Sequence, residues 1–328
     1  MITVEHLTKK YGGKVAVDDL SFTLRPGAVT GFLGPNGSGK STTMRCMLGL
    51  DRPTSGNVLF DGKPYREMKA PLCEVGALLD GKAFHPGRTA RQHLRIIAAG
   101  NGISRKRVDE VLEMTGIASA AKKKLKGFSL GMGQRLGIAS ALLGDPKVLM
   151  FDEPVNGLDP DGVRWVRELA RSFAAEGRTV FISSHLMSEM SVTADDLVII
   201  GKGKLIAQGP ISTFTQSRAH TSVKVEGPNP TQILQAIAQA GYEPEFRQPA
   251  EGYPQGWIEI RGAKRSEIGK LLYARNLEIH ELSESHSSLE DVFMELTENS
   301  MDYRVAENTG KNGNTPETGN GTAAEGTR

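Results

Sequence analysis

The chain has 328 residues, of which 38% are hydrophobic and 24% charged, and its formal net charge is +2. The length allows one large domain or two ordinary ones, and the small net charge gives no positive argument for nucleic acid as a partner. Two cysteines, Cys46 and Cys73, exclude a disulfide framework. No apolar run approaches the ~18 residues that span a bilayer, and we expect no signal peptide. If the protein acts at a membrane, we therefore expect it to do so through a partner chain.

The first sixty residues contain three short segments in which apolar and polar residues alternate. Residues 2–7, 21–24 and 57–60 follow this pattern, which is typical of half-buried strands. We expect these segments to form a small antiparallel sheet. Tyr11 lies between the first two. It is either a packing aromatic at the surface or a platform on which an adenine ring stacks.

An apolar run at residues 28–33 predicts a buried strand, and a glycine-rich stretch at residues 34–42 follows it directly. The stretch fits the phosphate-loop pattern G-x-x-x-x-G-K-S and leads into a possible helix. Glycines let several backbone N–H groups point at one anion, and the helix start adds partial positive charge. The alternative is a tight turn in a glycine-rich chain. The predicted nucleotide-binding residues of this loop are Gly34, Asn36, Gly37, Ser38, Gly39, Lys40, Ser41 and Thr42.

The middle of the chain changes from strands to helices. An apolar strand is predicted from Cys73 to Leu79 and ends at Asp80. Residues 85–145 then carry helical signals, among them Ser104 as an N-cap candidate, and we interpret them as an inserted helical subdomain. The lysines at positions 122, 123, 124 and 126 are interpreted as a solvated helix end or turn, with attraction of phosphates or an acidic partner loop as the alternative.

Two acidic residues follow the continuous apolar run at residues 148–151, which predicts a strand buried on both faces of a parallel sheet. Such sheets bind ligands at the carboxyl ends of their strands. Asp152 is suited to hold Mg²⁺ and Glu153 to polarise an attacking water, as Mg²⁺-dependent phosphoryl chemistry requires. The alternative is a pair of solvated carboxylates, or carboxylates that bond nearby helix N–H groups. This alternative weakens because Lys40 and Ser41, which suit the outer phosphates and Mg²⁺, lie in the same chain.

Further strand and helix signals follow. Asp159 is an N-cap candidate for a helix that runs to about Ala175. His185 comes after the predicted strand at residues 179–183, where it could contact a terminal phosphate or orient Glu153. A lone histidine at a strand end is more often structural. The strands at residues 197–200 and 204–207 are expected to end the main domain.

Near residue 210 the pattern resets. Strands and helices alternate over residues 221–297, which predicts a small α+β appendage, and residues 301–328 have the composition of a disordered tail. The expected limits are therefore 1–210, 211–300 and 301–328.

The segment F-S-L-G-M-G-Q-R at residues 128–135 lies upstream of Asp152. Together with the phosphate loop and the acidic strand end, it resembles the ATP-binding cassette (ABC) family of transporter ATPases over roughly residues 2–210. The resemblance makes residues 34–42 the Walker A loop, 148–152 Walker B and 156–159 the D-loop, which ends at Asp159. It also implies the following roles: Glu153 as the catalytic glutamate, His185 as the switch histidine, Tyr11 as the adenine-stacking aromatic, and Ser129 and Gly131 as the signature contacts to a nucleotide.

Two departures from the family pattern stand out. Leu130 and Met132 replace a glycine and a glutamine of the usual signature, and Asp80 replaces the Q-loop glutamine. A carboxylate at position 80 could be a Mg²⁺ ligand. The signature variant and the ending at residues 288–297 resemble the drug- and antibiotic-exporting subfamily of the daunorubicin- and bacitracin-resistance type.

The resemblance implies an α/β P-loop NTPase with a RecA-like core, an antiparallel β-subdomain and an inserted helical subdomain. It further implies an ATPase that uses ATP and Mg²⁺, pairs head to tail as a homodimer, and energises a separate integral membrane permease from the cytoplasmic face. The cargo is expected to be drug-like, an antibiotic or lipid-like, and no nucleic-acid partner is expected. The alternatives are a soluble cassette ATPase of DNA repair or translation and an ATP-dependent regulator. One cassette, no sustained heptads and near-neutral charge disfavour the former.

Overall fold

The structure is a computed structural model that describes residues 1–215, 221–248, 256–286 and 289–297. The tail predicted to be disordered, residues 301–328, lies outside the described residues. None of the helices in the described segments combines the length and the apolarity needed to cross a bilayer.

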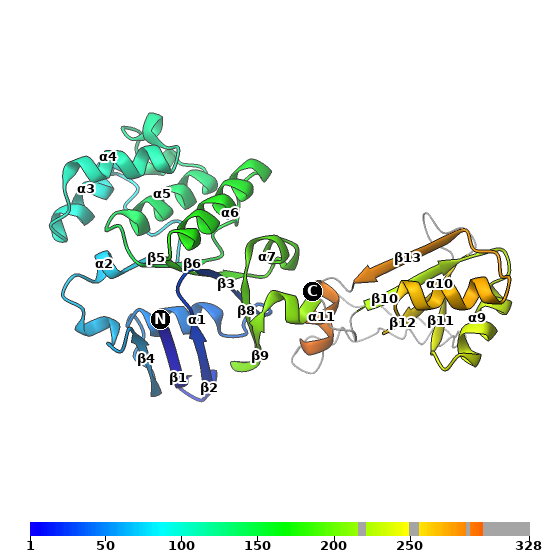
Figure 1. The fold of residues 1–328 in the computed structure, drawn as a ribbon. Helices are drawn as coiled ribbons and strands as arrows, with labels where there is room; N and C mark the ends of the chain where they lie inside the picture. The colour runs from blue at the N-terminus through cyan, green and yellow to red at the C-terminus, as the bar shows by residue number, and fades with distance from the viewer. Residues whose placement is uncertain (216–220, 249–255, 287–288, 298–328) are drawn as a thin grey trace, which may run out of the picture.

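A six-stranded sheet with the order β5-β6-β7-β3-β8-β9 forms the centre of the cassette (Figure 1). Its strands pair in parallel except β9, which runs antiparallel to β8. The strand predicted from Cys73 to Leu79 is shorter, because Pro71 starts one turn of helix, α2 (Pro71–Glu74), that includes Cys73. The strands are β3 (Ala28–Leu33), β5 (Val75–Leu78), β6 (Val148–Asp152), β7 (Thr179–Ser184), β8 (Asp196–Gly201) and β9 (Lys204–Pro210).

The predicted antiparallel sheet is confirmed. It has the order β2-β1-β4 and consists of β1 (Ile2–Tyr11), β2 (Lys14–Leu24) and β4 (Ser55–Phe60). Helix α1 (Lys40–Met47) contacts both this sheet and β6. The aromatic rings of Phe22, Phe32 and Phe181 meet between the two sheets, with 4.9 Å between the centroids of Phe32 and Phe181. Met44 and Met47 of α1 are buried in the same apolar cluster as these rings.

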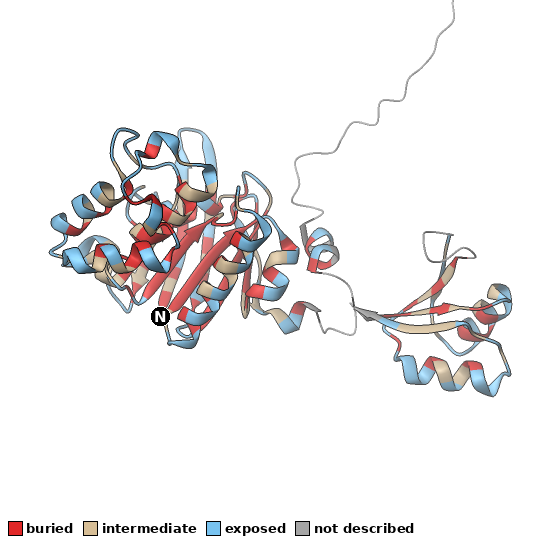
Figure 2. Cartoon of the chain, turned by 90° about the horizontal axis from the view of Figure 1, so that it is seen from above, coloured by how far each residue is buried: buried red, intermediate tan, exposed pale blue. Residues whose placement is uncertain are grey.

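Helices cover the opposite face of the central sheet (Figure 2). Ser104 caps α4 and Asp159 caps α6, which ends at Ala175, so these three predictions are confirmed. Between β5 and β6 the chain forms the helical insertion, which stands to one side of the sheet (Figure 1). The helices are α3 (Ala90–Gly100), α4 (Arg105–Met114), α5 (Leu130–Leu142), α6 (Pro160–Ala175) and α7 (Met187–Thr193), with short 3-10 turns η1 (Tyr65–Glu67), η2 (Ala118–Ala120) and η3 (Leu125–Gly127).

A second body follows the cassette in the chain. Its antiparallel sheet has the order β11-β12-β10-β13 and its elements alternate as β-α-β-β-α-β, the ferredoxin-like arrangement. It has a separate apolar core around Val223, Val225 and Ile260. The polar strand β13 carries only one large apolar residue, Leu282, and sequence reasoning did not predict it. The elements are β10 (Thr221–Glu226), α9 (Pro230–Gln239), β11 (Pro244–Arg247), β12 (Trp257–Arg261), α10 (Arg265–Ala274) and β13 (Glu281–His286).

Two helices flank this body in the chain but pack on the cassette. They are α8 (Ile211–Thr215) and α11 (Leu289–Thr297), which contact each other, and α11 also contacts α7. Phe214 and Phe293 are buried in the same core as the cassette helices. The expected domain limits at 210 and 300 stay predictions, but this packing places α8 and α11 with the first body.

Candidate nucleotide-binding and hydrolysis site

The phosphate loop joins β3 to α1, and its residues line a hollow of about 390 Å³. Gly39 ends the loop with a φ of 107°, and a Cβ there would lie 2.5 Å from the carbonyl oxygen of Ala16. Only glycine fits this position. The hollow is lined by Tyr11, Lys14, Ala16, Asn36, Gly37, Gly39, Lys40, Ser41, Thr42 and Glu153. Most of the predicted loop residues therefore face one cavity.

The Lys40 side chain lies at the base of the loop and is 6% exposed. Its Nζ donates to the carbonyl oxygen of Gly34 at 2.7 Å and lies 3.3 Å from that of Pro35 and 3.8 Å from Glu153 Oε1. Burial lowers the pKa of the Lys40 ammonium, and the nearby carboxylates of Glu153 and Asp152 oppose this shift. Phosphate oxygens could replace the two carbonyl partners.

Asp152 and Glu153 lie at the carboxyl end of β6, beside Ser183 on β7. The Ser183 hydroxyl donates to Asp152 Oδ1 and accepts the N–H of Glu153 at 2.9 Å. Glu153 has a φ of 49°, an uncommon conformation for a residue with a Cβ and one that is enriched at functional sites. One hydroxyl thus orients both acidic residues.

The predicted acidic and histidine residues come together at this edge. His185 Nδ1 lies 2.8 Å from Glu153 Oε2, while the other carboxylate oxygen of Glu153 faces Lys40. Sequence reasoning missed Ser183. The available signal was its place in the strand after β6, since neighbouring parallel strands bring their carboxyl ends to one edge.

Tyr11 lies at the rim of the same hollow, and its side chain is fixed by polar contacts. Its hydroxyl donates to Asp51 Oδ2 at 2.7 Å, the same oxygen accepts from Arg45 Nε at 2.7 Å, and Lys9 Nζ lies 4.7 Å from the ring centroid. The hydrogen bond to Asp51 raises the pKa of Tyr11. Tyr11 as a residue is 47% exposed, which leaves surface for a stacked base. Its role as an adenine platform stays a prediction.

The signature residues Ser129 and Gly131 do not line the hollow over their own chain's phosphate loop. Ser129 caps α5 by accepting the N–H of Met132 at 3.2 Å. Leu130 packs on the D-loop, since a Cβ on Gly157, whose φ is 76°, would lie 2.1 Å from Leu130 Cδ2. The leucine side chain at position 130 therefore fits because position 157, which faces it, is a glycine without a Cβ. Asp159 accepts the N–H of Gly162 at 2.9 Å.

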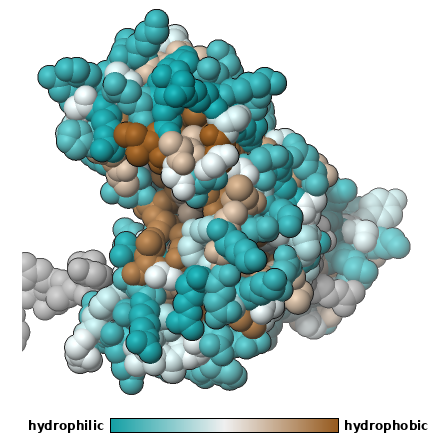
Figure 3. All heavy atoms as spheres, turned by 90° about the vertical axis from the view of Figure 1, so that its left-hand side faces the viewer, coloured by the Kyte–Doolittle hydropathy of each residue, from teal (hydrophilic) through white to brown (hydrophobic). Residues whose placement is uncertain are grey.

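Asp80 does not line the nucleotide hollow. Its carboxylate is exposed and accepts the N–H of Lys82 at 2.8 Å. It borders a different, apolar hollow of about 500 Å³ between the core and the helical insertion, visible on the face in Figure 3. Among the described residues no three His, Cys, Asp or Glu side chains gather around a metal position.

The donor set that remains for Mg²⁺ is the Ser41 hydroxyl and the Asp152 carboxylate. Mg²⁺ keeps several waters and binds few protein ligands beside substrate phosphates, so these two residues fit such an ion. Asp152 is nearly buried, and its second carboxylate oxygen remains available because Ser183 uses Oδ1.

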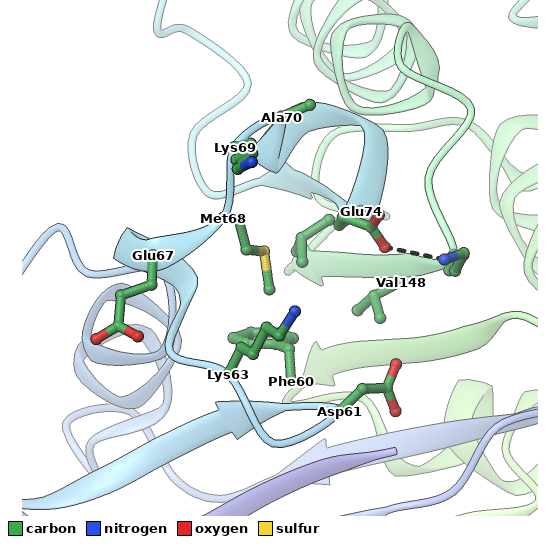
Figure 4. A pocket seen from close by; sticks show the side chains of 11 residues that line it. Phe60, Asp61, Lys63, Glu67, Met68, Lys69, Ala70, Glu74 and Val148 are labelled. Atoms are coloured by element: carbon green, nitrogen blue, oxygen red, sulfur yellow. Dashed lines mark ion pairs between the residues drawn. The ribbon is translucent and has the colours of Figure 1, made fainter.

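A further hollow of about 470 Å³ lies apart from all these residues (Figure 4). Val75 and Val148, which begin β5 and β6, line it together with charged residues, including a Glu74–Lys147 ion pair of 3.2 Å. It therefore lies at the amino ends of the parallel strands, opposite the edge where such sheets bind nucleotides.

Comparisons with known proteins agree with this geometry. A family model described as ABC transporter matches residues 17–156, and one described as a domain of unknown function matches residues 221–290. The chain is 37% identical over 300 residues to the bacitracin transport ATP-binding protein BcrA of Bacillus licheniformis, covering 90% of this chain and 97% of that protein. It is 36% identical over 208 residues to the lantibiotic transport ATP-binding protein SrtF of Streptococcus pyogenes, covering 63% and 90%.

Solved structures of cassettes share this fold. The dimeric structure of MJ0796, a bacterial ABC transporter cassette, matches with a TM-score of 0.60 at 24% identity, covering 64% of this chain and 99% of that one. The predicted P-loop NTPase fold is thereby confirmed. The chain belongs to the ABC transporter family. It is an ATP-binding subunit of that family, and its enzymatic activity is ATP hydrolysis coupled to transport.

Replacing Ser183 by alanine is expected to destabilise the fold by about 1–3 kcal/mol, because the nearly buried Asp152 carboxylate and the Glu153 N–H both lose their partner. ATP turnover should fall as well, since Glu153 loses its backbone anchor. Chemical denaturation and a phosphate-release assay measure the two effects. Ser188→Ala, at an exposed position on α7, is the matched control and should change neither. Equal behaviour of the two variants would contradict the role of Ser183.

Proposed function

We propose that this chain is the ATP-hydrolysing subunit of an exporter that moves a drug-like, antibiotic or lipid-like substrate out of the cell. The observation that carries the hydrolytic part of this proposal is the position of Glu153, held between Lys40 and His185 at the edge of the phosphate loop. The transport names of the bacitracin and lantibiotic relatives support an antibiotic cargo. They favour transport over a soluble cassette ATPase of DNA repair or translation.

The chemistry follows from the residues at the site. The loop N–H groups and Lys40 bind the outer phosphates of ATP, which is the substrate. Ser41 and Asp152 would hold Mg²⁺, which would neutralise charge on the phosphates. Glu153 accepts a hydrogen bond from the attacking water and polarises it, and His185 keeps the Glu153 carboxylate turned toward the hollow.

The cassette alone provides half of a closed site. Ser129 caps α5 and leaves its own chain's phosphate hollow uncovered. Two copies paired head to tail would place Ser129 and Gly131 of one copy over the nucleotide of the other, as the N-terminal end of α5 favours an anion. The dimeric cassette of the same fold supports this pairing.

A permease contact is best supported at the apolar hollow near Asp80. Its lining includes Leu50, Leu72, Phe84 and Ile97, and Leu50 is 59% exposed. Exposed apolar surface gathered in a hollow marks interaction sites in soluble proteins. An integral membrane subunit docked there would hold the cassette at the cytoplasmic face of the membrane.

Tagged protein, extracted in mild detergent, is expected to bring down an integral membrane protein that mass spectrometry identifies. Leu50→Asp should abolish this capture, because a carboxylate enters the apolar contact. Leu205→Asp, at an exposed leucine on β9 outside the hollow, should retain it. Capture of a ribosomal or DNA-repair protein in place of a membrane subunit would overturn the export proposal.

Glu153→Gln should bind ATP and accumulate dimers while turnover falls by about 10²–10⁴-fold, because an amide cannot polarise the attacking water. Size-exclusion chromatography with and without Mg-ATP and a phosphate-release assay measure this. Adding Ser129→Arg to this variant should remove the dimer, since the long side chain blocks closure on the partner's nucleotide. Unimpaired turnover in Glu153→Gln, or persistent dimers in the double variant, would contradict the assigned roles.

ATP binding is expected to take up a proton in the alkaline range. Burial holds the pKa of Lys40 below its ordinary 10.5, and the negative phosphates raise it again on binding. Affinity should therefore weaken as the pH rises through the lowered pKa, and no uptake occurs well below it. Calorimetry in buffers of different ionisation enthalpy measures the uptake. Lys14→Gln, which removes an exposed lysine of the same hollow, should keep it, and loss of uptake in this variant would contradict the assignment to Lys40.

A further inference from the structure

The last described helix, α11, is built into the core of the cassette although it follows the ferredoxin-like body in the chain. Leu289, Val292 and Phe293 are only 3%, 1% and 5% exposed. They belong to the same apolar cluster as Met187 and Met190 of α7. Helix α11 contacts α8, and Figure 1 shows α11 separate from the second sheet. The apolar face of α11 therefore packs in the core of the first body.

Helix α7 begins at Met187, two residues after His185. The strand before His185, β7, is buried along its whole length. The position of His185 therefore depends on how α7 is held, because the histidine lies in the short link between a fixed strand and this helix. The side chain of His185 is itself exposed, so packing of its own atoms does not fix it.

Three neighbours hold α7. On one side it packs on β3 so closely that a Cβ on Gly31 would lie 3.1 Å from Met190 Sδ. On another, α6 binds it through Arg167 Nη2 to Glu189 Oε2 at 2.8 Å and Arg171 Nη1 to the carbonyl oxygen of Val192 at 2.6 Å. The third neighbour is α11. Two of these neighbours, β3 and α6, belong to the cassette core. The third, α11, follows the second body in the sequence.

We propose that α11 positions His185 by packing on α7, with Phe293 and Val292 as the positioning residues. This inference rests on the proposed role of His185 toward Glu153. The ferredoxin-like body is connected to α8 on one side and to α11 on the other.

The test separates positioning from general stability. Phe293→Ala should lower kcat by about 10- to 100-fold, the loss typical of a catalytic group displaced by about 1 Å, with the affinity for ATP unchanged. Phe293→Leu should restore most of the turnover, because it refills the contact. Met294→Ala, the neighbouring residue that is 56% exposed, is the matched control and should behave as the unaltered chain. Val292→Ala is a milder second variant for the case in which Phe293→Ala does not fold.

A double-mutant cycle with His185→Ala decides whether α11 acts through the histidine. The loss caused by Phe293→Ala, or by Val292→Ala, should vanish in the His185→Ala background, since the positioned group is absent. A loss that persists there, or a parallel loss of ATP affinity, overturns the inference and leaves the proposed function intact. Unchanged turnover in His185→Ala alone overturns the proposed role of His185 and the inference with it.

Discussion

The buried ammonium of Lys40 is the interaction on which the rest of the site depends. A charge that is almost removed from water must be satisfied by the protein, and here two loop carbonyls and the Glu153 carboxylate do so. This need shapes the loop, since the carbonyl oxygens of Gly34 and Pro35 must turn toward Nζ, and the Pro35 carbonyl also accepts the N–H of Ser38 at 3.1 Å. It also fixes the distance between the loop and the end of β6. Binding and hydrolysis are thus arranged around one charged group.

The acidic edge is organised by a contact between strands. β6 and β7 pair in parallel with Asp152 opposite Ser183, so one serine hydroxyl reaches a carboxylate and the next backbone N–H. The left-handed backbone of Glu153 then turns its side chain back toward Lys40 and His185. A hydrogen bond between neighbouring strands is therefore what converts two consecutive acidic residues into groups with different surroundings, one nearly buried and one facing the hollow.

Features encoded in short stretches were predictable from the sequence. The loop from Gly34 to Thr42, the strand that ends at Asp152 and the cap at Asp159 depend on neighbours in the chain, and the structure has each element in place. Ser183 was not predictable in this way, because its role arises from register between strands. Strand β13 was not predicted, because its polar sequence lacks the hydrophobic alternation of a strand, although it pairs with β10. The packing of α11 on the cassette was not predicted, because amphipathic spacing indicates that a helix faces an apolar core but does not indicate which core.

The path of the chain through α8 and α11 has a consequence for how this protein can be divided. The ferredoxin-like body is an insertion, with both of its ends anchored on the cassette, and is not an extension at the end of the chain. Cutting the chain after residue 215 to isolate the ATPase would remove Leu289, Val292 and Phe293 and open the apolar core beside α7. A faithful minimal cassette must instead splice α8 to α11. A foreign domain that replaces residues 221–286 would likewise be joined to the cassette at both of its ends, through α8 and α11.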